Sequence, residues 1–240
     1  MRRKRLLAGL LLTFVCYMAS AQTTGNSDRV SLPLTSTEGL ELINVKAKVA
    51  EHKGRKSLLV TRADQIAVAD NRETLAIIPG VEFKNGTIEV ELAGEPAADA
   101  DAQARGFVGI AFRVQKTDPL SYEGFYLRPV NGRAEDQLQR NHSTQYISHP
   151  EYPWFRLRKE YPGVYESYVD LVTGEWTKVR MVVSGQQARV YVHGAEQPCL
   201  IVKDLKHGET TGKVALWLAS STVAHFRNLV ITPDREPSSN

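Results

Sequence analysis

The sequence predicts an all-β fold of two packed antiparallel sheets. Apolar and polar residues alternate along many short stretches, such as 87–92 and 179–183, and no long helical stripe interrupts them. Alternation with a period of two is typical of strands that bury one face. Turns rich in glycine separate the stretches, as at Gly54 and Gly185. Many short strands joined by such turns favour a sandwich over a parallel sheet, which would need intervening helices.

The expected strands follow one another along the chain in this order. In the first half, two strands surround the turn at Gly54, and three more follow: 42–49, 56–61, 87–92, 107–114 and 125–128. In the second half, a hairpin through the turn 184–187 comes first, and Pro233 ends the last strand: 178–183, 190–193, 214–219 and 223–231.

Two segments lack this alternation. Residues 95–105 are rich in alanine and aspartate and predict a loop with one helical turn. Residues 131–168 are predicted to form a long loop insertion that is rich in aromatic residues. So many aromatic side chains argue against disorder, so this loop is expected to fold over the sheet.

The N-terminal segment has the pattern of a signal peptide. Arg2, Arg3, Lys4 and Arg5 precede the short apolar run 6–18, and Ala19-Ser20-Ala21 is a small-residue cleavage site. We therefore expect residues 1–21 to be a signal peptide and the protein to be periplasmic or extracellular. A flexible leader at 22–31, one domain at 32–233 and a flexible tail at 234–240 complete the expected organisation.

The charge of the mature chain argues against nucleic acid as a partner. The whole chain has 30 basic and 27 acidic residues, and removing the four basic residues of the signal leaves 26 basic against 27 acidic. The apolar run 6–18 is too short to span a bilayer comfortably, so integral membrane association is not expected.

The cysteine and histidine positions predict neither a disulfide nor a metal site. Only Cys199 remains after cleavage, before the apolar run 200–202, where a buried strand residue is expected. The histidines show no metal-ligand spacing. We therefore expect no zinc site and no cofactor. Asp99 and Asp101 could contact calcium, but a solvated loop explains them without a metal ion, since calcium takes six or more oxygen ligands.

Large side chains occupy several positions on the expected outer faces of strands. Arg113, Tyr126, Arg128 and Trp217 each alternate with apolar neighbours, so each is predicted to project away from the core. Stacking aromatics and guanidinium donors suit a carbohydrate site, provided that these strands are neighbours in one sheet. The alternative is structural, with the 131–168 loop burying the Trp217 indole.

Polar residues near these strands are further candidates for ligand binding or catalysis. Asn141 and Tyr146 of the expected loop are candidate binding residues, and His142 is a candidate base or an ordinary loop histidine. Glu123, just before the Tyr126 strand, is the best candidate for a catalytic acid. Glu89 and Glu91 form another acidic pair, but the alternation of an outer strand face explains them without chemistry.

Four strand motifs resemble a known family. They are the Gly-Phe-Val-Gly-Ile-Ala-Phe-Arg strand at 106–113, the Gly-Glu-Trp hairpin entry at 174–180, and the closing strands at 212–217 and 226–231. Together they resemble the 3-keto-disaccharide hydrolase-like group of the concanavalin A-like lectin and glucanase superfamily. The resemblance implies a jelly-roll sandwich whose concave sheet faces sugar. Some relatives cleave oxidised disaccharides, and others bind carbohydrate.

These observations leave three hypotheses about function. The first is an exported sandwich domain that binds a glycan or oligosaccharide on its concave sheet without a cofactor. The second is a glycoside hydrolase acting on an unusual saccharide, such as a keto-disaccharide, with Glu123 or His142 as the acid or base. The third is an envelope scaffold or adhesion protein that captures a protein partner through its aromatic loop.

Overall fold

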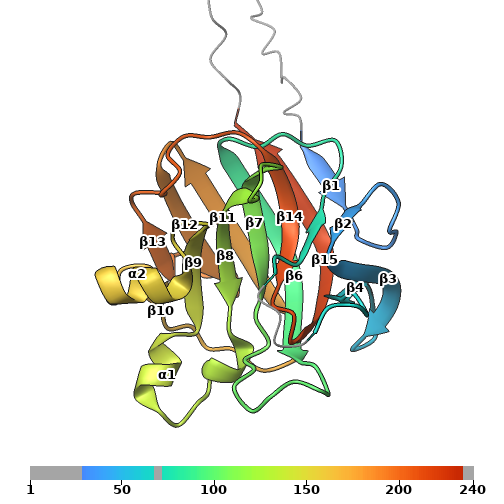
Figure 1. Ribbon diagram of the computed structural model, residues 1–240, viewed down its shortest axis with the longest axis horizontal. Coiled ribbons are helices and arrows are strands. Elements are labelled where there is room, and N and C mark those ends of the chain that lie inside the picture. The colour runs from blue at the N-terminus through green and yellow to red at the C-terminus, as the bar shows by residue number, and fades with distance from the viewer. Residues whose placement is uncertain (1–28, 68–71, 235–240) are drawn as a thin grey trace, which may run out of the picture.

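The computed structural model describes residues 29–67 and 72–234. Within these ranges the chain forms two antiparallel sheets that pack face to face in a jelly-roll sandwich, as Figure 1 shows. The expected all-β fold is therefore confirmed. The expected signal peptide, most of the leader and all but the first residue of the tail lie outside the described residues.

Sheet A contains the N-terminal hairpin and the long C-terminal strand. Its strands run in the order β13-β12-β11-β6-β15-β4-β3, and β1 pairs with the second half of β15. Their bounds are β1 Val30–Leu32, β3 Val45–His52, β4 Arg55–Arg62, β6 Gly86–Pro96, β11 Thr177–Ser184, β12 Gln187–Val192, β13 Leu200–Val202 and β15 Thr222–Pro233.

Sheet B carries the candidate site and runs in the order β10-β9-β8-β7-β14-β5-β2. Its strands are β2 Glu41–Ile43, β5 Leu75–Ile77, β7 Val108–Gln115, β8 Ser121–Leu127, β9 Thr144–His149, β10 Glu166–Ser167 and β14 Lys213–Leu218. The 3-10 helix η1 (Pro129–Asn131) and the short helices α1 (Gln137–Asn141) and α2 (Trp154–Glu160) lie at its β9–β10 end.

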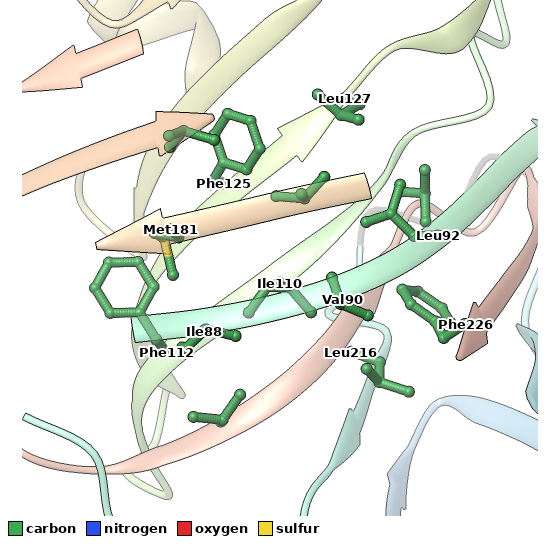
Figure 2. Close-up of a cluster of buried hydrophobic side chains, with 14 of the residues drawn as sticks. Ile88, Val90, Leu92, Ile110, Phe112, Phe125, Leu127, Met181, Leu216 and Phe226 are labelled. Atoms are coloured by element: carbon green, nitrogen blue, oxygen red, sulfur yellow. The ribbon is translucent and has the colours of Figure 1, made fainter. Parts of the chain in front are cut away.

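The core lies between the two sheets and is built from their alternate residues. Figure 2 shows Ile88, Val90 and Leu92 of β6 in one cluster with Ile110 and Phe112 of β7. Fully burying each such side chain stabilises the fold by about 1.5–3 kcal/mol. This face-to-face contact is why most inward positions of both sheets are apolar.

The segment 131–168 differs from the expected loop. It contains α1, α2 and the two strands β9 and β10, and β9 pairs with β8 along its whole length. Five of the six residues of β9 are buried, whichever face they point to. Each face of β9 mixes polar and apolar residues, because both faces are covered, so its sequence shows no alternation. The expected loop at 95–105 is found at 97–107, because residues 95 and 96 belong to β6, and it contains turns but not the expected helical turn.

Cys199 is half-buried directly before β13 rather than fully buried within a strand. Burial raises the pKa of its thiol to about 11, so the thiol is protonated at neutral pH and reacts slowly with electrophiles.

Two histidines stack on the outer face of sheet A. The rings of His52 and His225 lie 4.1 Å apart between centroids, and the Trp176 ring meets His52 edge-on. The His225 Nδ1 atom lies 3.1 Å from the Ser57 hydroxyl, and His225 is only 6% exposed. Burial, reinforced by His52, lowers the pKa of His225 from 6.5 to about 4.

We expect this stack to make the protein sensitive to mild acid. The folded pKa of His225 lies below its unfolded value, so the unfolded chain binds more protons as the pH falls. The free energy of unfolding should therefore fall between pH 6.5 and pH 4, by up to about 3 kcal/mol. Urea denaturation at a series of pH values would measure the fall, and His225→Gln should flatten it. If the free energy of unfolding fell equally with pH in the wild type and in His225→Gln, His225 would not be the group responsible.

Candidate functional site

A pocket of about 630 Å³ opens on the outer face of sheet B. Its floor comes from strands β8, β9 and β14 and from Phe107 just before β7. Its walls come from the 72–74 segment, the 101–104 loop, the 150–155 segment and the 218–221 turn. The volume falls within the usual range for sites that hold small organic ligands. The charged, histidine and aromatic side chains that line it include Glu73, Asp101, Phe107, Tyr122, Tyr126, His149, Trp154, Phe155 and Trp217.

The floor is a stack of aromatic rings that forms across a glycine of strand β7. Tyr126 of β8 and Trp217 of β14 both pair with Gly109 of the intervening strand β7. Strands two positions apart are separated by roughly 9–10 Å, yet the two rings stack with centroids 4.7 Å apart. The rings can close over β7 only because Gly109 has no side chain. Phe107 packs on the other side of Tyr126, at 5.4 Å.

A chain of hydrogen-bonded polar side chains extends from this stack along the same face of sheet B. The Trp217 indole N–H donates to the Tyr122 hydroxyl at 3.1 Å, and that hydroxyl donates to Glu73 Oε2. His149 stacks on the Tyr122 ring, and its Nδ1 lies 3.2 Å from Glu73 Oε1. Burial, reinforced by Glu73, raises the pKa of Tyr122 well above its usual value, so the hydroxyl keeps its proton. Glu73 is thus a fixed carboxylate at the edge of the pocket.

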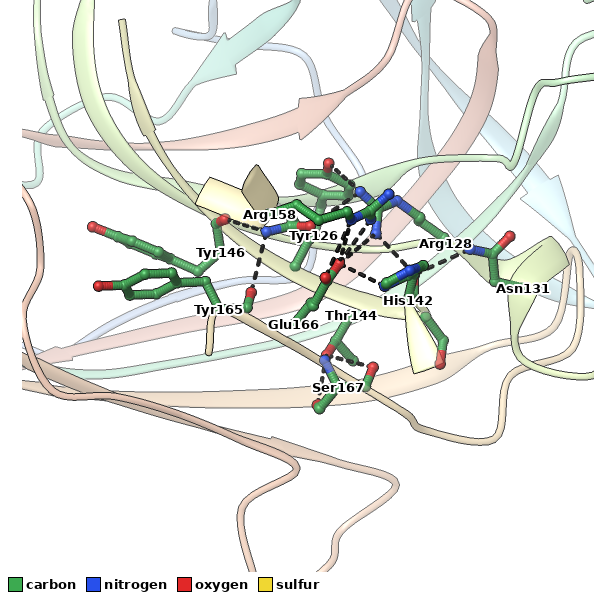
Figure 3. Close-up of polar contacts among 12 residues, drawn as sticks. Tyr126, Arg128, Asn131, His142, Thr144, Tyr146, Arg158, Tyr165, Glu166 and Ser167 are labelled. Atoms are coloured by element: carbon green, nitrogen blue, oxygen red, sulfur yellow. Dashed lines mark hydrogen bonds and ion pairs between the residues drawn. The ribbon is translucent and has the colours of Figure 1, made fainter. Parts of the chain in front are cut away.

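The rim holds two exposed aromatic side chains at the start of α2. Trp154 is 41% exposed and Phe155 is 60% exposed. Arg158 lies over the Trp154 ring at 4.8 Å and donates to the buried Glu166 of β10. The Glu166 network in Figure 3 therefore fixes α2 and, with it, the aromatic rim.

The structure brings three of the predicted residues together. Tyr126 and Trp217 form the floor stack, and the Arg128 guanidinium lies over the Tyr126 ring at 5.1 Å. Tyr126 and Arg128 are nonetheless buried, and Arg128 donates to the Tyr126 hydroxyl, the Gln145 side chain and the His142 carbonyl. Of the three, Trp217 remains half-exposed toward the pocket.

Arg113 does not join this group. A β-bulge places its backbone in the left-handed region, with φ at 53°, and its side chain is 1% exposed. The guanidinium donates to the backbone carbonyls of Lys84, Gly185 and Gly208 and to the side chain of Asn85. It therefore ties three loops together and does not line the pocket. The expectation of one shared face for Arg113 and Trp217 is not met, because the extra residue of a bulge reverses the alternation.

Glu123 and Tyr146 point into the sandwich. Glu123 is fully buried, and it accepts the Tyr146 hydroxyl at 2.6 Å and the His207 backbone N–H at 2.9 Å. Tyr146 in turn accepts the Lys206 backbone N–H. Burial, together with Glu123, raises the pKa of Tyr146 well above its usual value. These two residues anchor the 205–208 loop from within, away from the pocket.

Asn141 and His142 lie at the end of α1, also outside the pocket. Asn141 is exposed and accepts a hydrogen bond from Gln137. His142 Nδ1 lies 2.7 Å from Glu166 Oε2. Figure 3 marks this contact with a dashed line. Burial lowers the pKa of His142, an effect that Glu166 opposes. The geometry gives His142 a place in the Glu166 network.

Sequence reasoning missed most of the polar lining. Tyr122 lies four residues before Tyr126 on the same strand, so the alternation alone places both on one face. His149 is the end of a strand that was not expected, and Glu73 precedes the short strand β5. No motif marks either of them. Among the described residues, no cluster of three His, Cys, Asp or Glu side chains is placed to hold a metal ion.

Comparison with known proteins shows a shared fold at low identity. The sequence matches no family model and no curated protein. A Bacillus subtilis protein of unknown function with a galectin-like fold superposes with a TM-score of 0.55 at 11% identity, over 85% of this chain and 94% of that one. The carbohydrate-binding module CBM66 of Bacillus subtilis gives 0.49 at 11% identity, over 80% and 98%. The Bacillus licheniformis β-glucanase gives 0.43 at 16%, over 88% and 100%.

The first of these likenesses shows that the chain has a galectin-like fold. The finer resemblance, to the 3-keto-disaccharide hydrolase-like group, rests on the strand motifs alone. None of the helices in the described part of the chain has the length and apolar character that crossing a bilayer requires.

Proposed function

We propose that this protein is an exported carbohydrate-binding domain that holds a glycan or oligosaccharide in the pocket on sheet B. The observation that carries the proposal is the half-exposed Trp217 indole on the pocket floor beside the fixed Glu73 carboxylate. Sugar rings have apolar C–H faces that pack on aromatic rings, and hydroxyl groups that donate to carboxylates. The galectin-like fold and the strand motifs support the same proposal.

Replacing Trp217 by alanine should weaken saccharide binding about tenfold or more, because aromatic anchors in pockets commonly contribute at least 2 kcal/mol. A glycan array followed by titration calorimetry on the best ligand would measure the loss. Trp176→Ala is the matched control, because Trp176 is also half-buried but lies outside the pocket, directly before β11 of sheet A. If the wild type and Trp217→Ala bound the saccharide equally well, the pocket floor would not be part of the binding site.

Glycoside hydrolysis is a second candidate, and two carboxylates favour it. Glu73 and Asp101 both line the pocket, and glycosidases commonly use a pair of carboxyl groups. Glu123 and His142 lie outside the pocket, so hydrolysis there would use Glu73 as the acid or base. Product release from keto-disaccharides or polysaccharides that is lost in Glu73→Gln would establish catalysis. Binding without product would leave the lectin-like role.

A further inference from the structure

The polar groups of the pocket favour hydrogen-bond donors in the ligand. Each Glu73 oxygen faces one protein partner, Tyr122 or His149, and a carboxylate oxygen has room for a second hydrogen bond. Because both partners hold the carboxylate, its orientation is set before a ligand arrives. A hydroxyl that donates to it would form a charge-assisted bond, which is stronger than one between neutral groups.

Cationic side chains near the pocket are mostly committed elsewhere. Arg128 and Arg158 pair with the buried Glu166 of the edge strand β10, and Arg113 holds three loops together. The described residues that line the pocket include two carboxylates, Glu73 and Asp101, and one guanidinium, that of Arg72 at the exposed rim. An anionic ligand would therefore meet net negative charge and few fixed donors.

We infer that the pocket selects neutral saccharides over acidic ones and that Glu73 determines this choice. This inference rests on the proposed function, since it assigns a ligand class to the same pocket. The hydroxyls of a neutral sugar donate to Glu73 while its C–H face packs on Trp217. A uronic acid in the same position brings its carboxylate near Glu73 and Asp101, and like charges placed together are strongly unfavourable.

Saccharide pairs that differ only in oxidation at C6 test this directly. Oligogalacturonides and α-1,4-linked galacto-oligosaccharides of equal length would be titrated in parallel, as would β-1,4-linked mannurono- and manno-oligosaccharides. We expect each neutral member that binds to do so at least tenfold more tightly than its acidic counterpart. Acidic members that bind equally or better would overturn the inference and leave the proposed function standing. A wild-type protein that binds no saccharide would overturn both.

Variants of the two carboxylates connect the preference to named residues. Glu73→Gln keeps the shape of the side chain and should lower the affinity for the neutral saccharide about tenfold. The ratio of the affinities for the neutral and acidic saccharides should also become smaller. Glu82→Gln is the matched control, because Glu82 is an exposed glutamate outside the pocket that pairs with Lys213. Asp101→Asn changes an exposed side chain and should narrow the preference without disturbing the fold. An unchanged preference in both pocket variants would refute the role of these carboxylates.

Discussion

Replacing Arg113 by methionine is expected to lower the free energy of unfolding by about 3 kcal/mol or more. Methionine fills much of the buried space of the Arg113 side chain but removes the hydrogen bonds that the guanidinium donates to the part-buried carbonyls of Lys84, Gly185 and Gly208. For a domain of this size, that loss lowers the melting temperature by roughly 6–12 °C. Calorimetry and urea denaturation would measure both quantities.

Arg189→Met provides the matched control for this effect. Arg189 lies on the exposed face of β12, so the same substitution should change the free energy of unfolding by less than about 0.5 kcal/mol. Arg113→Lys should recover only part of the stability, because an ammonium group cannot present the fork of a guanidinium. A stability of Arg113→Met close to wild type would show that the loops hold without this residue.

Gly109→Ala is expected to destabilise the fold by about 3 kcal/mol and to disrupt the pocket floor. A Cβ atom at this position would lie 2.0 Å from the Phe125 carbonyl oxygen and 2.6 Å from Tyr126 Cα. Because those are backbone atoms, strands β7 and β8 must separate to accept the methyl group. Urea denaturation would give the stability, and near-ultraviolet circular dichroism would detect the loss of the Tyr126–Trp217 stack.

Gly124→Ala on the neighbouring strand separates crowding by backbone from crowding by side chains. Its added Cβ would meet Ile147 Cγ1 at 3.0 Å and Tyr122 Cε2 at 3.3 Å, both of them side-chain atoms that can shift. We expect a smaller loss, of about 1 kcal/mol, and an intact spectrum. If Gly109→Ala kept the near-ultraviolet spectrum as Gly124→Ala does, Gly109 would not be required for the stacking of Tyr126 and Trp217.

The alternation of residues along a strand predicted the sandwich and the faces of its regular strands. Tyr126 and Trp217 were correctly placed on one outer face, since β8 and β14 keep an unbroken period at these positions. Arg113 was placed wrongly because β7 gains one residue at the bulge, which exchanges inner and outer positions. A bulge of this kind leaves no clear mark in the sequence.

The extent of a strand also decided which residues were assigned to the site. Strand β8 begins at Ser121, so Glu123 shares the inward direction of Phe125. Had the strand been extended backwards by four residues, the alternation would have placed Glu123 inside and Tyr122 outside. Glu73 is different, because it reaches the pocket from another part of the chain. Only the folded arrangement brings its carboxylate to Tyr122.

The three tryptophans of this chain lie in three different surroundings: Trp217 on the pocket floor, Trp154 on the rim and Trp176 beside the stacked histidines. Their fluorescence therefore separates events on the two faces of the sandwich without an added dye. A ligand in the pocket should change the emission of Trp217 and Trp154, whereas protonation of His225 should quench Trp176. A Trp176→Phe variant leaves an emission signal that follows the pocket alone.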